Sequence, residues 1–364
     1  MIFKMKILFT IGNLKKGGAE RVIANLSNSF IENHEIILVL TTAEEIEYKL
    51  NDKIKLYRLD KINQNNNFII KNINRVIGLK KIVKEEQPNI MISFLPEPSY
   101  RLLLVKPKNI PAIVSVRNDP NEEYNNFIKR TIMKLLYAKA NGFVFQTPQA
   151  KSYFSNKIQQ KSTIIANPIK EDFICKRYEG KREKTIVTVG RLTEQKNQKL
   201  LIDAFNCLNK KYDDYTLKIY GEGNLENELK KYTQSLEKKD KIIFMGTVND
   251  VKKEIYKSSL FVLSSNYEGM PNSLMEAMAM GIPCISANCK SGGPDYLFNN
   301  EKNGILFEVN NKEDLTKKIE KILSNSKIAE KIGKNGNEYA KNFEIKKITL
   351  QWEKFIKRII KEGK

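Results

Sequence analysis

Short apolar segments alternate with amphipathic helical segments twice along the chain, and this alternation restricts the possible fold more than any other feature. In the first half, strand-length apolar segments occur at residues 6–11, 35–41, 54–59, 90–94, 112–116 and 143–146, with helical patterns at 19–30, 68–86 and 124–140. In the second half, strand patterns occur at 185–189, 216–220, 242–245, 260–263, 283–286 and 305–307, with helices between them. Because such alternation buries parallel sheets between layers of helices, the sequence predicts an α/β fold with doubly wound, Rossmann-like domains.

The length of 364 residues exceeds the usual size of one compact core, so two domains are expected. We place the boundary beside Asn167 and Pro168, because proline restricts its own backbone and that of the preceding residue. The first domain then spans 1–166 and the second 167–344. A final helix at 345–364 carries Trp352 and Phe355 on its apolar side.

The segment most informative about function runs from 264 to 283 and holds two carboxylates. Glu268 lies in a loop after a strand pattern, and Glu276 lies one to two turns inside the following helix, whose first residue is expected to be Pro271 and whose end is marked by Gly281. The N–H groups of a helix start favour phosphate. Carboxylates instead accept hydrogen bonds from vicinal hydroxyls. A nucleotide sugar, with hydroxyls on both sides of a diphosphate, matches both features.

The same segment, Glu268-Gly-Met-Pro-Asn-Ser-Leu-Met-Glu276, resembles the signature of retaining glycosyltransferases of family four, a glycogen-synthase-like group with the GT-B fold. Further stretches match at 17–21, at 190–192 with Lys196, and at 221–223, so the resemblance covers nearly the whole chain. It implies two Rossmann-like domains facing across a cleft. The N-terminal domain would bind the acceptor and receive the final helix, and the C-terminal domain would bind the nucleotide sugar.

The resemblance also implies roles for individual residues. Glu268 would contact the donor sugar and Glu276 the ribose, while Arg191 and Lys196 would hold the diphosphate. Preplaced cations lower the barrier most where negative charge builds on a leaving nucleotide. The other expected donor-binding residues are Gly17, Gly18, Gly190, Gly221, Gly246, Val248, Gly269, Met270, Pro271 and Asn272.

One position departs from the family pattern. Many relatives carry a histidine at a strand end of the first domain, whereas the only histidine here is His34, and Asn118 stands where that histidine is expected. We therefore count Asn118 among the catalytic candidates. No residue qualifies as a covalent nucleophile, so the resemblance implies same-face attack with retention of configuration. Candidate residues on the acceptor side are Arg117, Asp119, Glu20 and Arg21.

A net charge of +21 favours an anionic partner. The basic excess is denser in residues 1–165 than in the rest, and the sequence lacks zinc-finger spacing, an RNA-binding pattern or a basic tail, so an anionic membrane surface fits better than nucleic acid. Residues 68–87 and 127–139 mix apolar and basic side chains, and we expect them to pack their apolar faces inward and to direct lysines toward lipid headgroups. With no apolar stretch of membrane-spanning length, a cytoplasmic protein peripheral to the inner membrane face is expected.

No metal site or cofactor is predicted. The four cysteines lack C-x-x-C spacing, which fits a reducing compartment, and the GT-B resemblance implies no essential metal, so the acidic pair at 213–214 is rejected as a metal site. The asparagine-rich residues 63–67 are interpreted as a loop.

The sequence thus predicts a hexosyltransferase that moves a hexose or N-acetylhexosamine from a UDP-sugar to a glycan. The segment from Ser291 to Asp295 resembles members that act on lipid-linked saccharides of surface polysaccharides, such as capsule or exopolysaccharide, or of protein glycans. One alternative is a nucleotide-sugar 2-epimerase on the same fold, which needs acid and base residues and usually histidine. Another is a non-catalytic basic protein that binds lipid or RNA, which would release no UDP from UDP-sugars.

Overall fold

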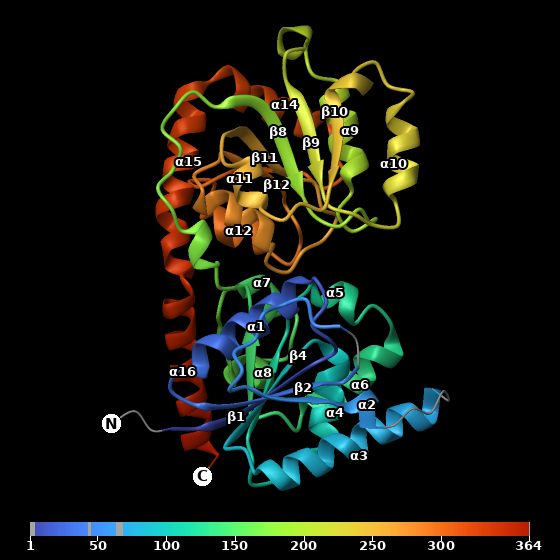
Figure 1. The fold of residues 1–364 in the computed structure, drawn as a ribbon, viewed down its shortest axis with the longest axis vertical. Coiled ribbons are helices and arrows are strands. Elements are labelled where there is room, and N and C mark those ends of the chain that lie inside the picture. The colour runs from blue at the N-terminus through green and yellow to red at the C-terminus, as the bar shows by residue number, and fades with distance from the viewer. Residues whose placement is uncertain (1–3, 43–44, 63–67, 364) are drawn as a thin grey trace. The chain divides into compact units, whose positions relative to one another are not determined.

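The chain forms two compact units (Figure 1). The structure is a computed structural model and describes residues 4–42, 45–62 and 68–363; the predicted loop at 63–67 lies outside the described residues. Unit 1 comprises Met1–Pro168 and Ile345–Lys364, and unit 2 comprises Ile169–Glu344. The division falls two residues after the predicted boundary at 166.

Unit 1 is built on a seven-stranded sheet in the order β3-β2-β1-β4-β5-β6-β7. Every neighbouring pair is parallel, as the alternation of strands and helices predicts. Central strands such as β1 and β4 are buried on both faces, which explains why they are continuous apolar runs. The strands are β1 (Lys6–Ile11), β2 (Glu35–Leu40), β3 (Lys55–Arg58), β4 (Ile90–Phe94), β5 (Ala112–Ser115), β6 (Gly142–Phe145) and β7 (Ser162–Ile164).

Helices cover both faces of this sheet. They are α1 (Gly18–Phe30), α2 (Leu59–Ile62), α3 (Phe68–Glu86), α4 (Pro96–Val105), α5 (Pro120–Glu123), α6 (Phe127–Tyr137), α7 (Pro148–Ser152), α8 (Asn156–Gln160) and α16 (Ile345–Glu362). The sequence predicts no helix at α4, because prolines in a pattern of this kind indicate a loop. Both prolines lie in the first turn, where helix N–H groups have no intrahelical partner. The predicted helix at 124–140 is shorter, since Asn126 caps α6 by accepting from the N–H of Lys129.

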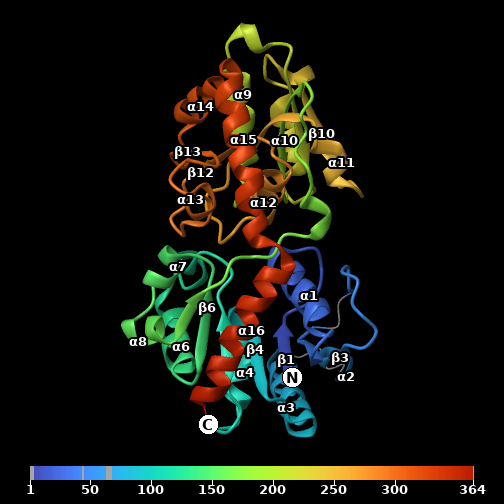
Figure 2. The same cartoon turned by 90° about the vertical axis from the view of Figure 1, so that its left-hand side faces the viewer.

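Helix α16 belongs to unit 1 and runs along it beside α1 (Figure 2). Trp352 is fully buried and its ring stacks on Phe94 of β4, with 5.9 Å between the ring centroids. Phe355 is buried as well, and the hydroxyl of Thr349 donates to that of Ser29 on α1 at 2.9 Å. The predicted apolar side of the last helix is therefore part of the core of unit 1.

Unit 2 contains a six-stranded parallel sheet in the order β10-β9-β8-β11-β12-β13. Its strands are β8 (Glu183–Val189), β9 (Thr216–Tyr220), β10 (Ile242–Gly246), β11 (Ser258–Leu263), β12 (Cys284–Ala287) and β13 (Ile305–Phe307). Its helices are α9 (Gln198–Asn206), α10 (Glu226–Thr233), α11 (Val251–Ile255), α12 (Asn272–Ala279), α13 (Gly293–Phe298), α14 (Lys312–Ser324) and α15 (Ser326–Ala340). Apolar side chains of these strands and helices form one buried core.

Helices α3 and α6 expose apolar side chains, which contradicts the predicted inward orientation. Ile69 is 67% exposed and Phe127 is 82% exposed. On α3 the polar side faces the unit instead, because Arg75 donates twice to Asp60 at 2.7 Å. Only the second half of α3 packs on the sheet, through Leu79, Ile82 and Val83. Within the described residues, no helix is long and apolar enough to span a membrane.

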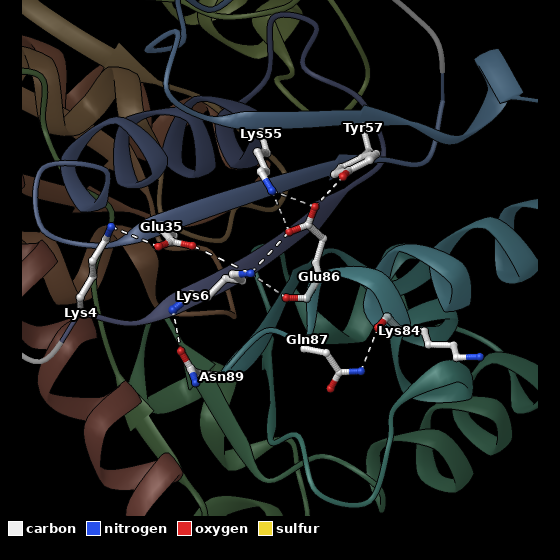
Figure 3. A network of polar contacts seen from close by, with 9 residues as sticks. All are labelled: Lys4, Lys6, Glu35, Lys55, Tyr57, Lys84, Glu86, Gln87 and Asn89. Atoms are coloured by element: carbon white, nitrogen blue, oxygen red, sulfur yellow. Dashed lines mark hydrogen bonds and ion pairs between the residues drawn. The ribbon is translucent and has the colours of Figure 1, made fainter.

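The C-terminus of α3 is anchored by a nearly buried carboxylate, Glu86 (Figure 3). Its Oε1 accepts a hydrogen bond from the Tyr57 hydroxyl at 2.6 Å, and both oxygens accept from Nζ of Lys55 at 3.1 Å. Nζ of Lys6 donates to the backbone oxygen of Glu86 at 2.9 Å. The hydrogen bond from Tyr57 lowers the pKa of Glu86 and raises that of Tyr57 to about 12. This network joins α3 to β1 and β3.

Glu86→Gln should lower the free energy of unfolding by about 1–3 kcal/mol at pH 7, because two ammonium groups and a phenol lose their charged acceptor. Since the folded-state pKa of Glu86 is lowered, its contribution is complete above the unfolded carboxyl pKa of about 4.3 and disappears as pH falls through the folded value. Urea unfolding at several pH values measures both effects.

The matched control is Glu85→Gln, one residue earlier on the same helix. Glu85 is 54% exposed and pairs with Lys81 at 3.8 Å. Its replacement should change stability by less than about 0.5 kcal/mol. Equal losses in the two variants would contradict the anchoring role of Glu86.

Candidate functional site

The sheet of unit 2 contains a position where the strand order reverses. β8 lies between β9 and β11, so the connections that follow β8 and β11 leave toward opposite sides. In open α/β sheets the crevice between two such connections, at the carboxyl ends of the strands, is the usual ligand position. The predicted donor residues at 190–196 follow β8 and those at 268–276 follow β11, so both groups border this crevice.

Glycines form a continuous row at the carboxyl ends of β8, β9 and β10. The N–H of Gly190 donates to the oxygen of Tyr220 at 3.0 Å, and that of Gly221 donates to the oxygen of Gly246 at 2.8 Å. Gly221 has a φ of +125°, and a Cβ there would lie 2.1 Å from the oxygen of Gly190. Only glycine fits at this position. Val248, half-buried, follows Gly246 in the loop after β10.

Lys196 and Glu268 form an ion pair that connects the two sides of the crevice. Nζ of Lys196 lies 2.5 Å from Oε1 of Glu268, and their side chains are only 16% and 7% exposed. The same Oε1 accepts from the hydroxyl of Ser265 at 2.6 Å, and the backbone oxygen of Glu268 accepts from the hydroxyl of Ser291. Such additional hydrogen bonds are what a desolvated ion pair requires. Arg191, the other predicted diphosphate ligand, is exposed to solvent.

Backbone hydrogen bonds fix the same two loops to each other. The N–H of Asn266 donates to the oxygen of Gln195 at 2.8 Å, and its side-chain amide donates to the oxygen of Glu194 at 2.8 Å. The hydroxyl of Ser264 donates to the oxygen of Lys196 at 3.0 Å. The position of Lys196 relative to Glu268 is therefore set by the fold.

Helix α12 carries the second carboxylate. Pro271 is the N-cap, with a φ of −75°, so the helix begins one residue later than predicted. Glu276 is the fifth residue of the helix and is 6% exposed. The helix ends at Ala279 with Met280 as its C-cap, Gly281 follows with a φ of +69°, and the N–H of Ile282 donates to the oxygen of Ala277 at 3.1 Å. This is the Schellman termination that the glycine predicts.

The loop between the two carboxylates packs tightly on the start of α13. A Cβ on Gly293 would lie 1.8 Å from the oxygen of Gly269, so the two backbones are in direct contact. Gly269, Met270 and Pro271 are buried, whereas Asn272 is partly exposed. Of these predicted donor residues, the first three shape the backbone, and Asn272 presents its side chain at the helix start.

Unit 1 has its own strand-order reversal, with β1 between β2 and β4. Gly17 and Gly18 follow β1, and Glu20 and Arg21 lie in the first turn of α1, both half-buried. Tyr48 fixes the glycine loop, because its Oη accepts from the N–H of Gly17 at 2.9 Å and donates to the oxygen of Gly17 at 2.8 Å. The sequence gives no signal for Tyr48, which lies 31 residues away.

Arg117, a predicted acceptor ligand, lies inside unit 1. It is 8% exposed, and its guanidinium lies 4.5 Å from the ring centroid of Phe94 and 5.5 Å from that of Trp352. Its Nη1 donates to Oδ1 of Asn167 at 3.0 Å. Burial lowers the pKa of Arg117 to about 9. The geometry suits a residue that fixes the loop after β5, and it does not suit direct contact with an acceptor.

Asp119 is also buried and serves as a helix cap. Its Oδ1 accepts from the N–H of Asn121 at 2.9 Å, so its carboxylate is occupied within α5. Asn118 is the partly exposed residue of this stretch, and its Nδ2 donates to Oε1 of Glu123 at 3.3 Å. Glu123 is the last residue of α5. The sequence does not predict it as a site residue, because no motif includes it.

The predicted residues of unit 2 lie close together, whereas those of unit 1 follow two strands that are not neighbours. In unit 2, the glycine row, Lys196, Glu268 and the start of α12 lie along the carboxyl edge of one sheet. In unit 1, Gly17, Gly18, Glu20 and Arg21 follow β1, while Asn118 follows β5, and β4 lies between these two strands. Ser265 and Ser291 both donate hydrogen bonds to Glu268. The sequence marks the segments around them, 264–283 and Ser291 to Asp295, but predicts no role for either serine.

Two families match adjoining parts of the chain. Residues 16–173 match the family described as Glycosyltransferase Family 4, and residues 170–339 match the family described as Glycosyl transferases group 1. Together the matches include the glycine loop of unit 1 and the crevice of unit 2. The chain belongs to the family 4-like glycosyltransferases. The resemblance seen in the sequence is confirmed.

Relatives of this glycosyltransferase include two named bacterial enzymes. It is 28% identical, over 98% of its own length and 99% of the relative, to a GalNAc-α-(1→4)-GalNAc-α-(1→3)-diNAcBac-PP-undecaprenol α-1,4-N-acetyl-D-galactosaminyltransferase of Campylobacter jejuni. It is 26% identical, over 77% of each chain, to a UDP-Gal:α-D-GlcNAc-diphosphoundecaprenol α-1,3-galactosyltransferase of Escherichia coli.

Solved structures share the fold of the glycosyltransferase. Alr3699/HepE of Anabaena, solved in complex with UDP, matches with a TM-score of 0.79 at 16% identity, over 97% of this chain and 100% of that one. A glycosyltransferase of Rickettsia africae matches with a TM-score of 0.78 at 22% identity, over 99% of each chain. The predicted GT-B fold, with two Rossmann-like domains, is confirmed.

Lys196→Ala and Glu268→Ala should each lower the free energy of unfolding by up to about 3–5 kcal/mol, because each leaves a buried charge without its partner. The double variant should lose less than the sum of the two, with a coupling energy of roughly 1–3 kcal/mol. Urea unfolding of the four proteins measures the coupling.

The control cycle uses the exposed pair of Lys230 and Glu226 on α10, which are 2.6 Å apart with side chains 49% and 28% exposed. Its coupling should be about 0.3–0.5 kcal/mol. Additive losses at Lys196 and Glu268 would show that the pair does not connect the two loops.

Proposed function

We propose that this glycosyltransferase transfers a hexose or N-acetylhexosamine from a UDP-sugar to a glycan carried on a polyprenyl diphosphate, with retention of anomeric configuration. The reaction serves the synthesis of a surface polysaccharide, such as capsule or exopolysaccharide, or of a lipid-linked glycan, at the inner face of the cell membrane. The observation that carries the proposal is the Lys196–Glu268 pair beside the start of α12.

The chemistry of the crevice in unit 2 matches each part of a nucleotide sugar. Glu268 accepts hydrogen bonds and suits the hydroxyls of the transferred sugar, while Lys196 and the exposed Arg191 suit the diphosphate. The N–H groups at the start of α12 add positive potential. Glu276, farther along the helix, suits the ribose hydroxyls. The glycine row allows the nucleotide to approach the backbone closely.

Cationic side chains carry the catalytic step in this proposal. As the bond between sugar and diphosphate breaks, negative charge builds on the departing UDP, and fixed cations stabilise it. Lys196 and Arg191 supply this charge, so we propose that the reaction needs no metal ion. The acceptor hydroxyl then attacks from the face that UDP leaves, which retains the configuration.

The relatives support the donor and acceptor classes. The name of the E. coli relative specifies UDP-Gal, and the names of it and of two C. jejuni relatives specify acceptors on diphospho-undecaprenol. A 2-epimerase is not favoured, because His34 is 3% exposed and precedes β2, at the amino edge of the sheet, whereas ligands bind at the carboxyl edge.

Lys196→Ala should reduce transfer by about two orders of magnitude or more, because a cation that stabilises the leaving diphosphate is lost. The assay combines UDP-N-acetylgalactosamine, UDP-N-acetylglucosamine, UDP-galactose or UDP-glucose with an undecaprenyl-diphosphate-linked N-acetylhexosamine and measures UDP release. EDTA should leave the rate unchanged, and NMR of the product should show the anomeric configuration of the donor.

Lys199→Ala is the matched control, since Lys199 is exposed on α9 and lies over the ring of Tyr232. It should keep nearly full activity. Wild-type-like transfer by Lys196→Ala would refute the assignment of Lys196, an inverted product would refute retention, and loss of activity with EDTA would refute the metal-free reaction.

The exposed faces of α3 and α6 support docking on an anionic membrane. On α3, Ile69, Asn72, Ile73, Val76 and Ile77 line an open groove of about 550 Å³. Lys80, Lys81 and Lys84 on α3 and Lys129, Arg130 and Lys134 on α6 are exposed as well. Helix α4 contacts both helices, so the two faces belong to neighbouring elements of unit 1. Apolar side chains inserted among lipids, with basic residues at the headgroups, explain why these isoleucines are exposed.

Replacing both Ile73 and Ile77 by serine should reduce binding to phosphatidylglycerol vesicles by at least about tenfold, because each buried isoleucine contributes about 1.5–3 kcal/mol. Flotation at low salt measures the bound fraction. Ile243→Ser in unit 2, where Ile243 is 38% exposed, is the control and should bind as the wild type does. Absence of binding by the wild-type protein would contradict membrane docking.

A further inference from the structure

A partly exposed carboxylate lies at the carboxyl edge of the sheet in unit 1. The chain leaves β5 at Ser115, passes Asn118, and forms α5, whose last residue is Glu123. Oε1 of Glu123 accepts from Nδ2 of Asn118 at 3.3 Å. In the described part of the chain, no Lys or Arg lies within ion-pair distance of this carboxylate. Lys129 of α6 acts on this carboxylate through its charge without forming an ion pair with it.

The turn of α5 sets the position of Glu123. Asp119 caps the helix through its side chain, and its backbone oxygen accepts from the N–H of Glu122 at 3.1 Å and from that of Glu123 at 3.0 Å. Pro120 fixes the first helical residue. The turn returns the chain toward Asn118, so the carboxylate of Glu123 lies beside the Asn118 amide. Asn118 is the residue that stands where the family pattern has histidine.

Burial, and to a smaller degree the charge of Glu123, raises the pKa of three tyrosines of unit 1, Tyr100, Tyr124 and Tyr137. Tyr100 of α4 is half-buried, and the hydroxyls of Tyr124 and Tyr137 lie 2.7 Å apart in the core. Burial raises the pKa of Glu123, while the hydrogen bond from Asn118 and the charge of Lys129 on α6 oppose this shift. Burial and then the charge of Glu123 raise the pKa of Tyr100 to about 12. The surrounding phenols therefore stay neutral near pH 7.

Two other titratable or charged residues, Tyr153 and Arg130, contact Tyr124. Tyr153, at the end of α7, stacks on Tyr124 with 6.1 Å between the ring centroids, and Arg130 of α6 donates to the backbone oxygen of Tyr124 at 3.0 Å. Helix α4, which carries Tyr100, starts from Leu95 with a φ of +70°. A leucine in this conformation is strained, and strain of this kind is concentrated at ligand sites.

We propose that Glu123 binds a hydroxyl group of the acceptor sugar, with Asn118 as its positioning residue. An ionised carboxylate without a cation partner accepts hydrogen bonds from hydroxyls and repels phosphate. The sugar part of the acceptor is therefore its ligand, and the diphosphate is not. This inference rests on the proposed function, in which a glycan is the acceptor.

The test compares the wild type with Glu123→Gln and with Glu122→Gln, a change at the neighbouring exposed acid of the same turn. Glutamine keeps the size of Glu123 and an oxygen for Asn118. The probes are the UDP-sugar that the wild type uses and an undecaprenyl-diphosphate-linked N-acetylhexosamine disaccharide. Glu123→Gln should lower kcat/KM for the acceptor roughly 10–100-fold, the effect of losing one charged hydrogen bond.

Four further readouts separate acceptor binding from a structural effect. The KM for the UDP-sugar, the slow UDP release without acceptor and the midpoint of thermal unfolding should match the wild type in Glu123→Gln. In the wild type, kcat/KM for the acceptor should fall as pH drops through the raised pKa of Glu123, because the protonated carboxyl is a poorer acceptor. This acidic limb should be absent in Glu123→Gln.

Acceptor kinetics in Glu123→Gln that equal those of Glu122→Gln would overturn the inference, and so would a parallel loss in the donor KM. Should Glu123→Gln fail to fold, Asn118→Ala keeps the carboxylate and should raise the acceptor KM while leaving the donor KM unchanged. A wild-type enzyme that releases UDP without acceptor but never transfers to lipid-linked glycans would instead refute the proposed function.

Discussion

The ion pair between Lys196 and Glu268 is the interaction on which the site in unit 2 depends. It joins the loops that follow β8 and β11, which leave the sheet toward opposite sides. Hydrogen bonds from Ser264 and Asn266 hold the two loops together, and the ion pair fixes the ammonium and carboxylate groups at their ends. Ser265 donates to the carboxylate of Glu268 and Ser291 donates to its backbone oxygen, so the position of Glu268 is fixed. Folding therefore orients the two opposite charges before a ligand binds. A ligand that carries hydroxyls beside a diphosphate meets both groups already in place.

A second cation, Arg117, has a different function in unit 1. Its guanidinium packs against the stacked rings of Phe94 of β4 and Trp352 of α16 and donates to Asn167, one residue before the end of the first segment of unit 1. The contacts of Arg117 therefore join the sheet, the final helix and the segment that leads out of the unit. A buried guanidinium with few hydrogen-bond acceptors is costly, and these aromatic contacts recover part of that cost.

Local rules were enough to predict part of this architecture. The glycines at 221 and 281 have positive φ, and the helix between Pro271 and Gly281 lies within one residue of its predicted start, because backbone geometry alone determines these features. The predicted orientation of α3 was wrong. The pattern of apolar and basic residues does not reveal that Arg75 binds Asp60, which places the polar side of the helix against the unit. The helix α4 was missed because its prolines resemble a loop signal. Each failure involves a tertiary contact or a position within the first helical turn.

The difference between local backbone rules and tertiary contacts also explains why the sequence contains a clear motif for nucleotide binding and none for acceptor binding. Nucleotide recognition uses glycine turns and a helix N-terminus, which need particular residues at fixed spacing and therefore leave a motif. The acceptor site that we propose in unit 1 uses side chains that only the folded chain brings together, such as Asn118 after β5 and Glu123 of α5. Such a site can change its specificity through single residues while the sheet and the donor motif stay the same. We therefore expect enzymes of this fold to share the donor crevice and to differ in the residues that follow β4 and β5.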